Sequence, residues 1–165
     1  MKMKTDYTVR AQKFLEEIFP VIEKFLDDPE DLADALFNYC DKKHERVQVR
    51  NGVSRWAVIR SDYVIKYDYN EDCWAGNCPD EVRKYAQAEK DGYAYLFAKI
   101  TSVVSHNITF YIMPRIKNIG SHRDFAKALT GDEFEYICNV ACDLHYHNYG
   151  WKDNKPVIVD YAFDP

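Results

Sequence analysis

The stretch that decides the fold runs from residue 46 to residue 67 and reads RVQVRNGVSRWAVIRSDYVIKY. Apolar and polar residues alternate in three short segments, which is the pattern of half-buried strands. Asn51-Gly52 separates the first two segments and Ser61-Asp62 the second two, and both pairs are typical of tight turns. The stretch therefore predicts a three-stranded antiparallel meander, with Lys66 on its third strand.

Two helices are predicted before the meander. Apolar residues recur at helical spacing from Tyr7 to about Asp27, and again from Asp28 to about Lys43. Pro20 lies inside the first of these segments and predicts a kink or a break, because proline has no N–H to donate. We interpret both helices as a support for the rest of the chain.

A further helix and a hairpin are predicted after the meander. Pro79-Asp80 opens the helix, which either ends near Gly92 or continues through Phe97 with a break at Gly92. Strands follow at residues 101–104 and 108–113, with His106-Asn107 at the turn between them. The residues expected to share one apolar face of the helix are Val82, Tyr85, Ala86 and Ala88.

The remaining segments predict two short helices and a β-ribbon. The helices begin after Ser121 and at Gly131, and the apolar run at 157–159 predicts a strand. In chain order the elements are two helices, three strands, a helix, two strands, two helices and two strands. This order predicts an α+β fold with a five-stranded antiparallel sheet.

Composition limits the classes of function. The 165 residues carry 27 acidic and 22 basic side chains, and the net charge of −5 argues against a nucleic-acid backbone as main partner. The N-terminal residues lack an apolar signal core, and no apolar run approaches the roughly 18 residues of a membrane span. The five cysteines resemble neither a secreted disulfide framework nor a zinc site. We therefore expect a cytoplasmic protein with reduced thiols and neither a nucleic-acid nor a membrane partner.

Polar residues in the C-terminal part of the chain form an ordered set. Asp143-Leu144-His145 is followed by Asn148, five residues after Asp143, and Asp160 ends the apolar strand. This segment resembles the catalytic segment of protein-kinase-like phosphotransferases, in the Asp-Leu-His-x-x-Asn form of their aminoglycoside- and choline-kinase-like members. The resemblance covers roughly residues 46–163 and extends to small kinase-like proteins of bacteria and their phages.

The resemblance implies a chemical role for each of these residues. Asp143 would act as the base toward an acceptor hydroxyl, while Asn148 and Asp160 would hold Mg²⁺ against the phosphates of ATP. Lys66, in the sequence Val-Ile-Lys, would bind the α- and β-phosphates. Glu81 would be the ion-pair partner of this lysine.

The remaining assignments stay open to competitors. Glu89, on the same helix, competes with Glu81 for the role of lysine partner. In place of the family's glycine-rich loop the chain has one glycine, Gly52, beside Ser54 and Arg55, which are the candidates to supply a hydroxyl and a positive charge. Met113 marks the expected hinge, where backbone groups would meet an adenine.

The resemblance also divides the chain into parts. Residues 1–45 form an N-terminal helical extension, 46–116 a kinase-like N-lobe, and 117–165 a reduced helical C-lobe that carries the catalytic and metal-binding segment. Asp-Tyr-Ala at 160–162 replaces the Asp-Phe-Gly of protein kinases, and the later helices of the family do not follow. A C-lobe truncated in this way would expose apolar surface, so a protein partner or a homodimer is expected to cover it.

Two classes of function follow from the resemblance. The first is a kinase-like phosphotransferase that uses Mg-ATP, and the ordered polar residues favour it. The second is a pseudokinase, a catalytically inactive kinase-like module that acts by contacting another protein, and the missing glycines and helices favour it. A third interpretation is an unrelated α+β protein whose polar residues match the family by chance.

Overall fold

The computed structural model of the chain describes residues 6–26, 28–43, 45–52, 55–69, 78–116, 122–141 and 148–160. These residues form an α+β fold with a five-stranded antiparallel sheet, a two-stranded ribbon, five α-helices and one short 3₁₀ helix. The chain divides into two compact units, Met1–Glu71 with Thr101–Arg115 and Asp72–Ile100 with Ile116–Pro165. The α+β class and the five-stranded sheet predicted from the sequence are confirmed.

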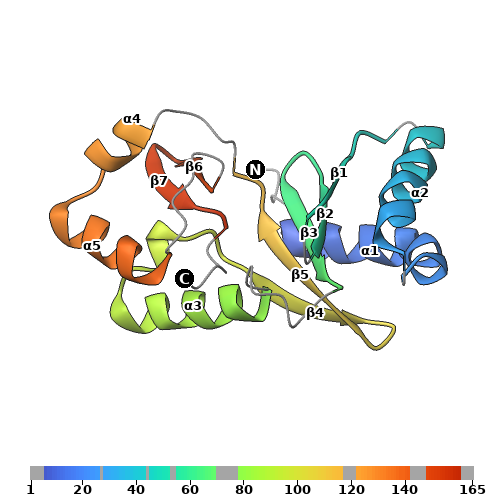
Figure 1. The fold of residues 1–165 in the computed structure, drawn as a ribbon, viewed down its shortest axis with the longest axis horizontal. Helices are drawn as coiled ribbons and strands as arrows, with labels where there is room; N and C mark the ends of the chain where they lie inside the picture. The colour runs from blue at the N-terminus through green and yellow to red at the C-terminus, as the bar shows by residue number, and fades with distance from the viewer. Residues whose placement is uncertain are drawn as a thin grey trace. The chain divides into compact units, whose positions relative to one another are not determined.

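The sheet belongs to the first unit. Its strands are β1 (Gln48–Asn51), β2 (Arg55–Ile59), β3 (Tyr63–Asp68), β4 (Thr101–Ser105) and β5 (Ile108–Pro114). They lie in the order β1-β2-β3-β5-β4, and every neighbouring pair is antiparallel (Figure 1). His106 and Asn107 join β4 to β5 with φ angles of 51° and 64°, the left-handed conformation that a two-residue hairpin turn requires.

One face of this sheet forms the hydrophobic core of the first unit. Val58, Ile65 and Ile112 follow one another in register across β2, β3 and β5, and all three are buried. Trp56 is 1% exposed, and its ring centroid lies 6.2 Å from that of Phe110 in a tilted arrangement. The apolar alternation of the meander therefore sets which side of each strand faces the core.

Two helices supply the other half of this core. α1 (Tyr7–Lys24) begins at Asp6, whose side chain accepts a hydrogen bond from the N–H of Thr8. α2 (Pro29–Lys42) begins in the same way at Asp28. The buried residues that the two helices add to the core are Ala11, Phe14, Leu15, Ile18, Phe19, Ile22, Leu32, Leu36 and Cys40.

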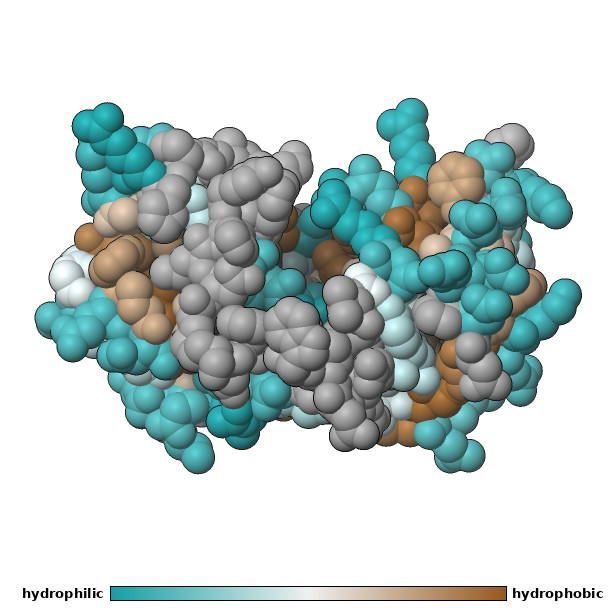
Figure 2. All heavy atoms as spheres, in the orientation of Figure 1, coloured by the Kyte–Doolittle hydropathy of each residue, from teal (hydrophilic) through white to brown (hydrophobic). Residues whose placement is uncertain are grey.

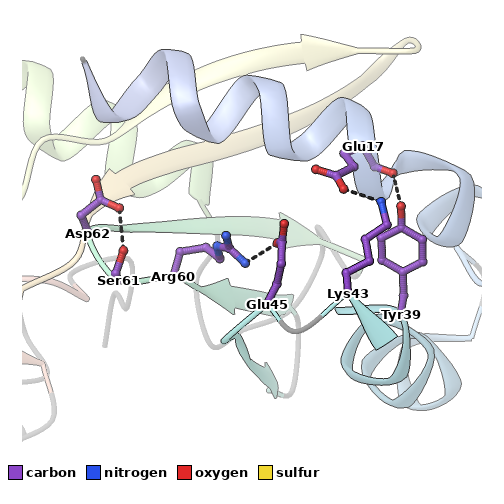
Figure 3. Close-up of polar contacts among 7 residues, drawn as sticks. All are labelled: Glu17, Tyr39, Lys43, Glu45, Arg60, Ser61 and Asp62. Atoms are coloured by element: carbon purple, nitrogen blue, oxygen red, sulfur yellow. Dashed lines mark hydrogen bonds and ion pairs between the residues drawn. The ribbon is translucent and has the colours of Figure 1, made fainter. Parts of the chain in front are cut away.

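The predicted break at Pro20 is wrong, because α1 continues through it. Because proline has no N–H, the carbonyl group one turn before Pro20 lacks its helical hydrogen bond. Pro20 is exposed, so this carbonyl group is on the solvent side of the helix. One turn earlier, the Tyr39 hydroxyl of α2 donates a hydrogen bond of 3.2 Å to the carbonyl oxygen of Glu17 (Figure 3). Lys43 Nζ lies 2.5 Å from Glu17 Oε1, so the two helices are tied together near the proline.

Arg60 joins the end of β2 to the segment between α2 and β1. Its Nη1 donates to Glu45 Oε2 at 2.6 Å (Figure 3), and its guanidinium carbon lies 4.3 Å from the centroid of the Phe14 ring of α1. The two side chains of the ion pair are 21% and 29% exposed. Arg60 therefore acts through packing on an aromatic ring as well as through charge.

The second unit contains helices and the ribbon. Its elements are α3 (Cys78–Asp91), the 3₁₀ helix η1 (Ala94–Leu96), α4 (His122–Lys127), α5 (Gly131–Val140), β6 (Tyr149–Lys152) and β7 (Lys155–Ile158). α3 stops at Gly92, whose φ of 83° favours glycine. The ribbon turns at Asp153 and Asn154, again with positive φ angles. The N–H of Ala98 donates to the carbonyl oxygen of Ile158 at 2.8 Å, which pairs the segment after η1 with β7.

The buried face of α3 differs from the predicted one. Val82 and Tyr85 are half-buried and Ala86 is exposed, whereas the buried residues are Cys78, Glu81, Lys84 and Ala88. The prediction grouped the apolar side chains, but the helix buries two charged ones a single turn apart. Glu81 and Lys84 both have interaction partners, which offsets the cost of removing their charges from water.

The exposed surface is mostly polar. Figure 2 shows hydrophilic side chains over much of the coloured surface on this side of the molecule, with apolar ones in separate patches. Among the described large apolar residues, Val104 on β4 is 72% exposed and Phe37 on α2 is 53% exposed. None of the helices in the described ranges is long and apolar enough to cross a membrane.

Candidate functional site

Lys66 lies on the face of the sheet opposite the core. It follows Ile65 of the core on β3, and successive residues of a strand point to opposite faces. β3 is an interior strand between β2 and β5, and Lys66 is only 7% exposed. An ammonium group is costly to bury unless it is bonded or paired, and Lys66 has an interaction partner in the structure. This lysine is therefore not a solvated charge on an edge strand.

Asp68 is a second buried charge on the same face, and the sequence analysis missed it. It lies two residues after Lys66 on β3, is 6% exposed and stands opposite Arg55 of β2 in register. Cross-strand neighbours share a face, so an acid and a base are placed side by side there. The signal in the sequence was the spacing of two between Lys66 and Asp68 on a predicted strand.

Gly52 uses its backbone groups within the sheet. Its N–H donates to the carbonyl oxygen of Arg55 at 2.8 Å, and its own carbonyl oxygen accepts a hydrogen bond from the Tyr69 hydroxyl. A Cβ at this position would lie 3.2 Å from the Arg55 carbonyl oxygen, which is a tight contact with backbone. Ser54, the neighbouring candidate, lies outside the described residues.

Met113 is buried on β5, opposite Val64 of β3 in register. Since Val64 lies two residues before Lys66, both Met113 and Val64 are on the same face as the lysine. That face therefore carries apolar residues beside the buried charges. A region of this kind offers both dispersion contacts to a ring and charge to an anion.

In the second unit, Glu81 and Glu89 have different environments. Glu81 lies in the first turn of α3 and is 0% exposed, whereas Glu89 is exposed to solvent. Lys84, one turn after Glu81, is 6% exposed, and the sequence analysis did not single it out. The sequence pattern did not mark Lys84 as buried, because burial depends on which side of the helix faces the rest of the unit.

Asn148 and Asp160 come together at one end of the ribbon. The register pairs Tyr149 with Ile158, so Asn148 and Val159 are the next residues outward on the two strands. The N–H of Val159 donates to the carbonyl oxygen of Asn148 at 2.7 Å, and Asp160 follows directly. The fold thus brings the backbone of Asn148 next to the residue that precedes Asp160.

The ribbon is anchored beside this pair. Tyr149 is 1% exposed, and its ring stacks on that of Phe125 of α4 with centroids 4.2 Å apart. Burial raises the pKa of the Tyr149 hydroxyl, so this group stays protonated. The aromatic stack fixes the start of β6 and with it the backbone of Asn148.

Amide and carboxylate oxygens are the hard ligands that Mg²⁺ prefers, and Mg²⁺ retains several waters when bound. Asn148 and Asp160 fit this requirement in ligand type. Among the described residues, no group of three or more His, Cys, Asp or Glu side chains could hold a metal ion. Asp143, the predicted base, lies outside the described residues, as do His145 and His147.

Comparisons with known proteins give little further information. No family model matches the chain, and no curated protein matches it. A solved structure titled "Structure of the streptomycin-ATP-APH(2")-IIa ternary complex" aligns with 77% of this chain and 69% of its own, at 12% sequence identity and a TM-score of 0.37.

Proposed function

We propose that this chain is a kinase-like phosphotransferase that uses Mg-ATP. The observation that carries the proposal is Lys66, a lysine buried on an interior strand of a five-stranded antiparallel sheet, on the face that does not form the core. A cation in this position suits the binding of the α- and β-phosphates of a nucleotide. Met113 and Val64 on the same face suit the contacts of an adenine ring.

The residues of the second unit receive the other roles in this proposal. Glu81, which is fully buried, is the proposed ion-pair partner of Lys66, and the exposure of Glu89 favours this choice. Asn148 and Asp160, adjacent at one end of the ribbon, are the proposed Mg²⁺ ligands. Asp143 is the proposed base that orients the acceptor hydroxyl. The finer assignment of a kinase-like N-lobe at 46–116 and a reduced C-lobe at 117–165 belongs to the same proposal.

A thermal-shift titration with Mg-ATP tests this function. Ligand bound to the native state raises the melting temperature by mass action, so the wild-type protein should show a concentration-dependent rise. Lys66→Met replaces the charged side chain with an apolar one of similar length and should abolish the rise in melting temperature. Lys66→Ala should act in the same way. The exposed Lys13→Ala serves as the matched control. Equal rises in the wild type and both Lys66 variants would remove Lys66 from the site.

One observation favours a second candidate function, a pseudokinase that binds another protein. Val104 and Phe37 are large apolar side chains that are more exposed than buried, and such side chains act as anchors in interfaces. In this case the biological effect would depend on them rather than on Asp143 and Asp160. A pull-down with Val104→Ser and Phe37→Ser separates this function from catalysis.

A further inference from the structure

One row of paired residues crosses the sheet on the face that carries Lys66. The register pairs Arg50 of β1 with Ala57 of β2, Ala57 with Lys66 of β3, and Lys66 with Tyr111 of β5. Residues paired directly across antiparallel strands have their side chains on the same face. The opposite face is that of Val49 and Val58, which pack on the core. Arg50 and Lys66 therefore leave the same face of the sheet at the same level.

The residue between the two cations in this row is small. Neighbouring strands are about 4.8 Å apart, so the Cα atoms of Arg50 and Lys66 are separated by about 10 Å. Ala57, between them, contributes only a methyl group. No larger side chain of the row stands between the two cations.

The charges on this face favour an anion. In the rows that flank Ala57 along the strands, Gln48, Ile59, Val64 and Met113 carry no charge, and Arg55 stands opposite Asp68. Of the described residues of β1, β2, β3 and β5 on this face, three are basic and one is acidic. Basic residues therefore outnumber acidic ones among these described residues, and Lys66 itself has an interaction partner.

Among the described residues of the turn after β1, the backbone N–H of Gly52 is already engaged. The N–H of Gly52, at the turn after β1, already donates to the Arg55 carbonyl oxygen. Where backbone N–H groups do not bind a phosphate, cationic side chains do. Arginine is well suited to this because it offers several hydrogen-bond donors. The exposed position of Arg50 leaves its guanidinium accessible to a ligand.

We infer that Arg50 and Lys66 together form a two-cation site for a linear di- or triphosphate, with Ala57 as its floor. Such an anion carries separate charged groups along its length, so each cation can bind one of them. This inference rests on the proposed function for the role of Lys66, and it adds Arg50 as a residue that selects polyphosphate over orthophosphate. A charge on an edge strand can also serve to prevent pairing with other strands, a role that involves no ligand.

Binding of inorganic tripolyphosphate in metal-free buffer, measured by calorimetry beside orthophosphate, tests the site directly. Arg50→Ala should weaken tripolyphosphate binding by at least about tenfold, and Arg50→Lys should retain most of it. Arg46→Ala is the matched control, because Arg46 is also exposed but precedes β1 and lies outside the row. Orthophosphate should bind weakly to every variant.

The outcomes separate this inference from the proposed function. Equal losses of tripolyphosphate affinity in Arg50→Ala and Arg46→Ala would show that the effect comes from overall positive charge, and would overturn the inference. Mg-ATP and tripolyphosphate binding that is lost in Lys66→Met but kept in Arg50→Ala would also overturn it, while leaving the proposed function in place. A wild-type protein that binds tripolyphosphate through both residues but does not bind Mg-ATP would overturn only the proposed function. A wild-type protein that binds neither would overturn both.

Discussion

The backbone of Val159 is bonded to that of Asn148, with 2.7 Å between the donor nitrogen and the carbonyl oxygen. This bond lies just beyond the last ladder pair of the ribbon and holds Asn148 next to the strand that leads to Asp160. The register of the ribbon, continued by one residue, sets Asn148 opposite Val159, and a slip by one residue would change which residue Asn148 stands opposite.

The first prediction concerns this pair. Asp160→Asn should weaken Mg²⁺-dependent ATP binding, because it replaces an anionic oxygen ligand with a neutral one. The measurement is the Mg²⁺ dependence of the ATP-induced rise in melting temperature. Asp153→Asn, at the turn of the same ribbon, is the control and should leave that rise unchanged. If both variants respond to Mg-ATP as the wild type does, Asp160 is not a metal ligand.

The second prediction separates the two candidate functions through Asp143. If Asp143 is the base that orients the acceptor, Asp143→Asn should lower turnover by about a hundredfold or more. ATP binding should hardly change, because the role proposed for Asp143 is toward the acceptor and not toward the phosphates. Turnover is followed as ATP hydrolysis and as phosphate transfer detected by mass analysis of the protein and its partners. A biological effect that survives both Asp143→Asn and Asp160→Asn would instead support the pseudokinase.

The third prediction concerns acid stability through Glu133 of α5. Its carboxylate accepts a hydrogen bond of 2.7 Å from the N–H of Thr130 and another of 2.7 Å from the Tyr95 hydroxyl. These bonds, the backbone one first, hold the pKa of Glu133 below its ordinary value. A lowered folded-state pKa stabilises the protein above the unfolded-state pKa, near 4.3, and this contribution is lost as the pH falls through the folded-state value.

Thermal unfolding of the wild type and of Glu133→Gln between about pH 7 and about pH 3 measures this contribution. The wild type should be the more stable at neutral pH, and the difference should shrink below about pH 4. The exposed Glu135→Gln, on the same helix, is the control. A difference between the wild type and Glu133→Gln that stays constant over the whole range would contradict the assignment.

The fourth prediction concerns the core. Trp56→Ala should lower the free energy of unfolding by about 3–5 kcal/mol, because it removes a buried ring and leaves a cavity. Within the described structure the indole N–H of Trp56 has no hydrogen-bond partner, so Trp56→Phe loses no such bond and should cost less. Chemical denaturation of both variants provides the measurement. Equal losses would show that the indole nitrogen contributes to stability.

Local patterns in the sequence were sufficient for most of the fold. The alternation around Lys66 located the meander, and His106-Asn107 located the hairpin turn, because both signals depend only on neighbouring residues. The break predicted at Pro20 was wrong because the outcome there does not depend on neighbouring residues alone. Its tolerance depends on exposure and on a contact from Tyr39 of another helix, which residue spacing does not reveal.

The candidate site was only partly accessible from the sequence. Lys66 and Asp160 were singled out as candidates because a charged residue in or after an apolar strand is unusual. Asp68 and Lys84 were missed because their burial depends on the packing of whole elements. Arg50 was missed because its relation to Lys66 requires the register of two strand pairs, which a one-dimensional pattern does not fix.

The position of β5 between β3 and β4 has a consequence for synthesis on the ribosome. β3 acquires its second neighbour only when the strand that starts at Ile108 has emerged, roughly forty residues after Asp68, which takes about 2–8 s at typical elongation rates. Throughout that interval one edge of β3 is open to the strands of other nascent chains. Charged residues on a strand are one way in which proteins limit such pairing, and Lys66 and Asp68 lie on this strand.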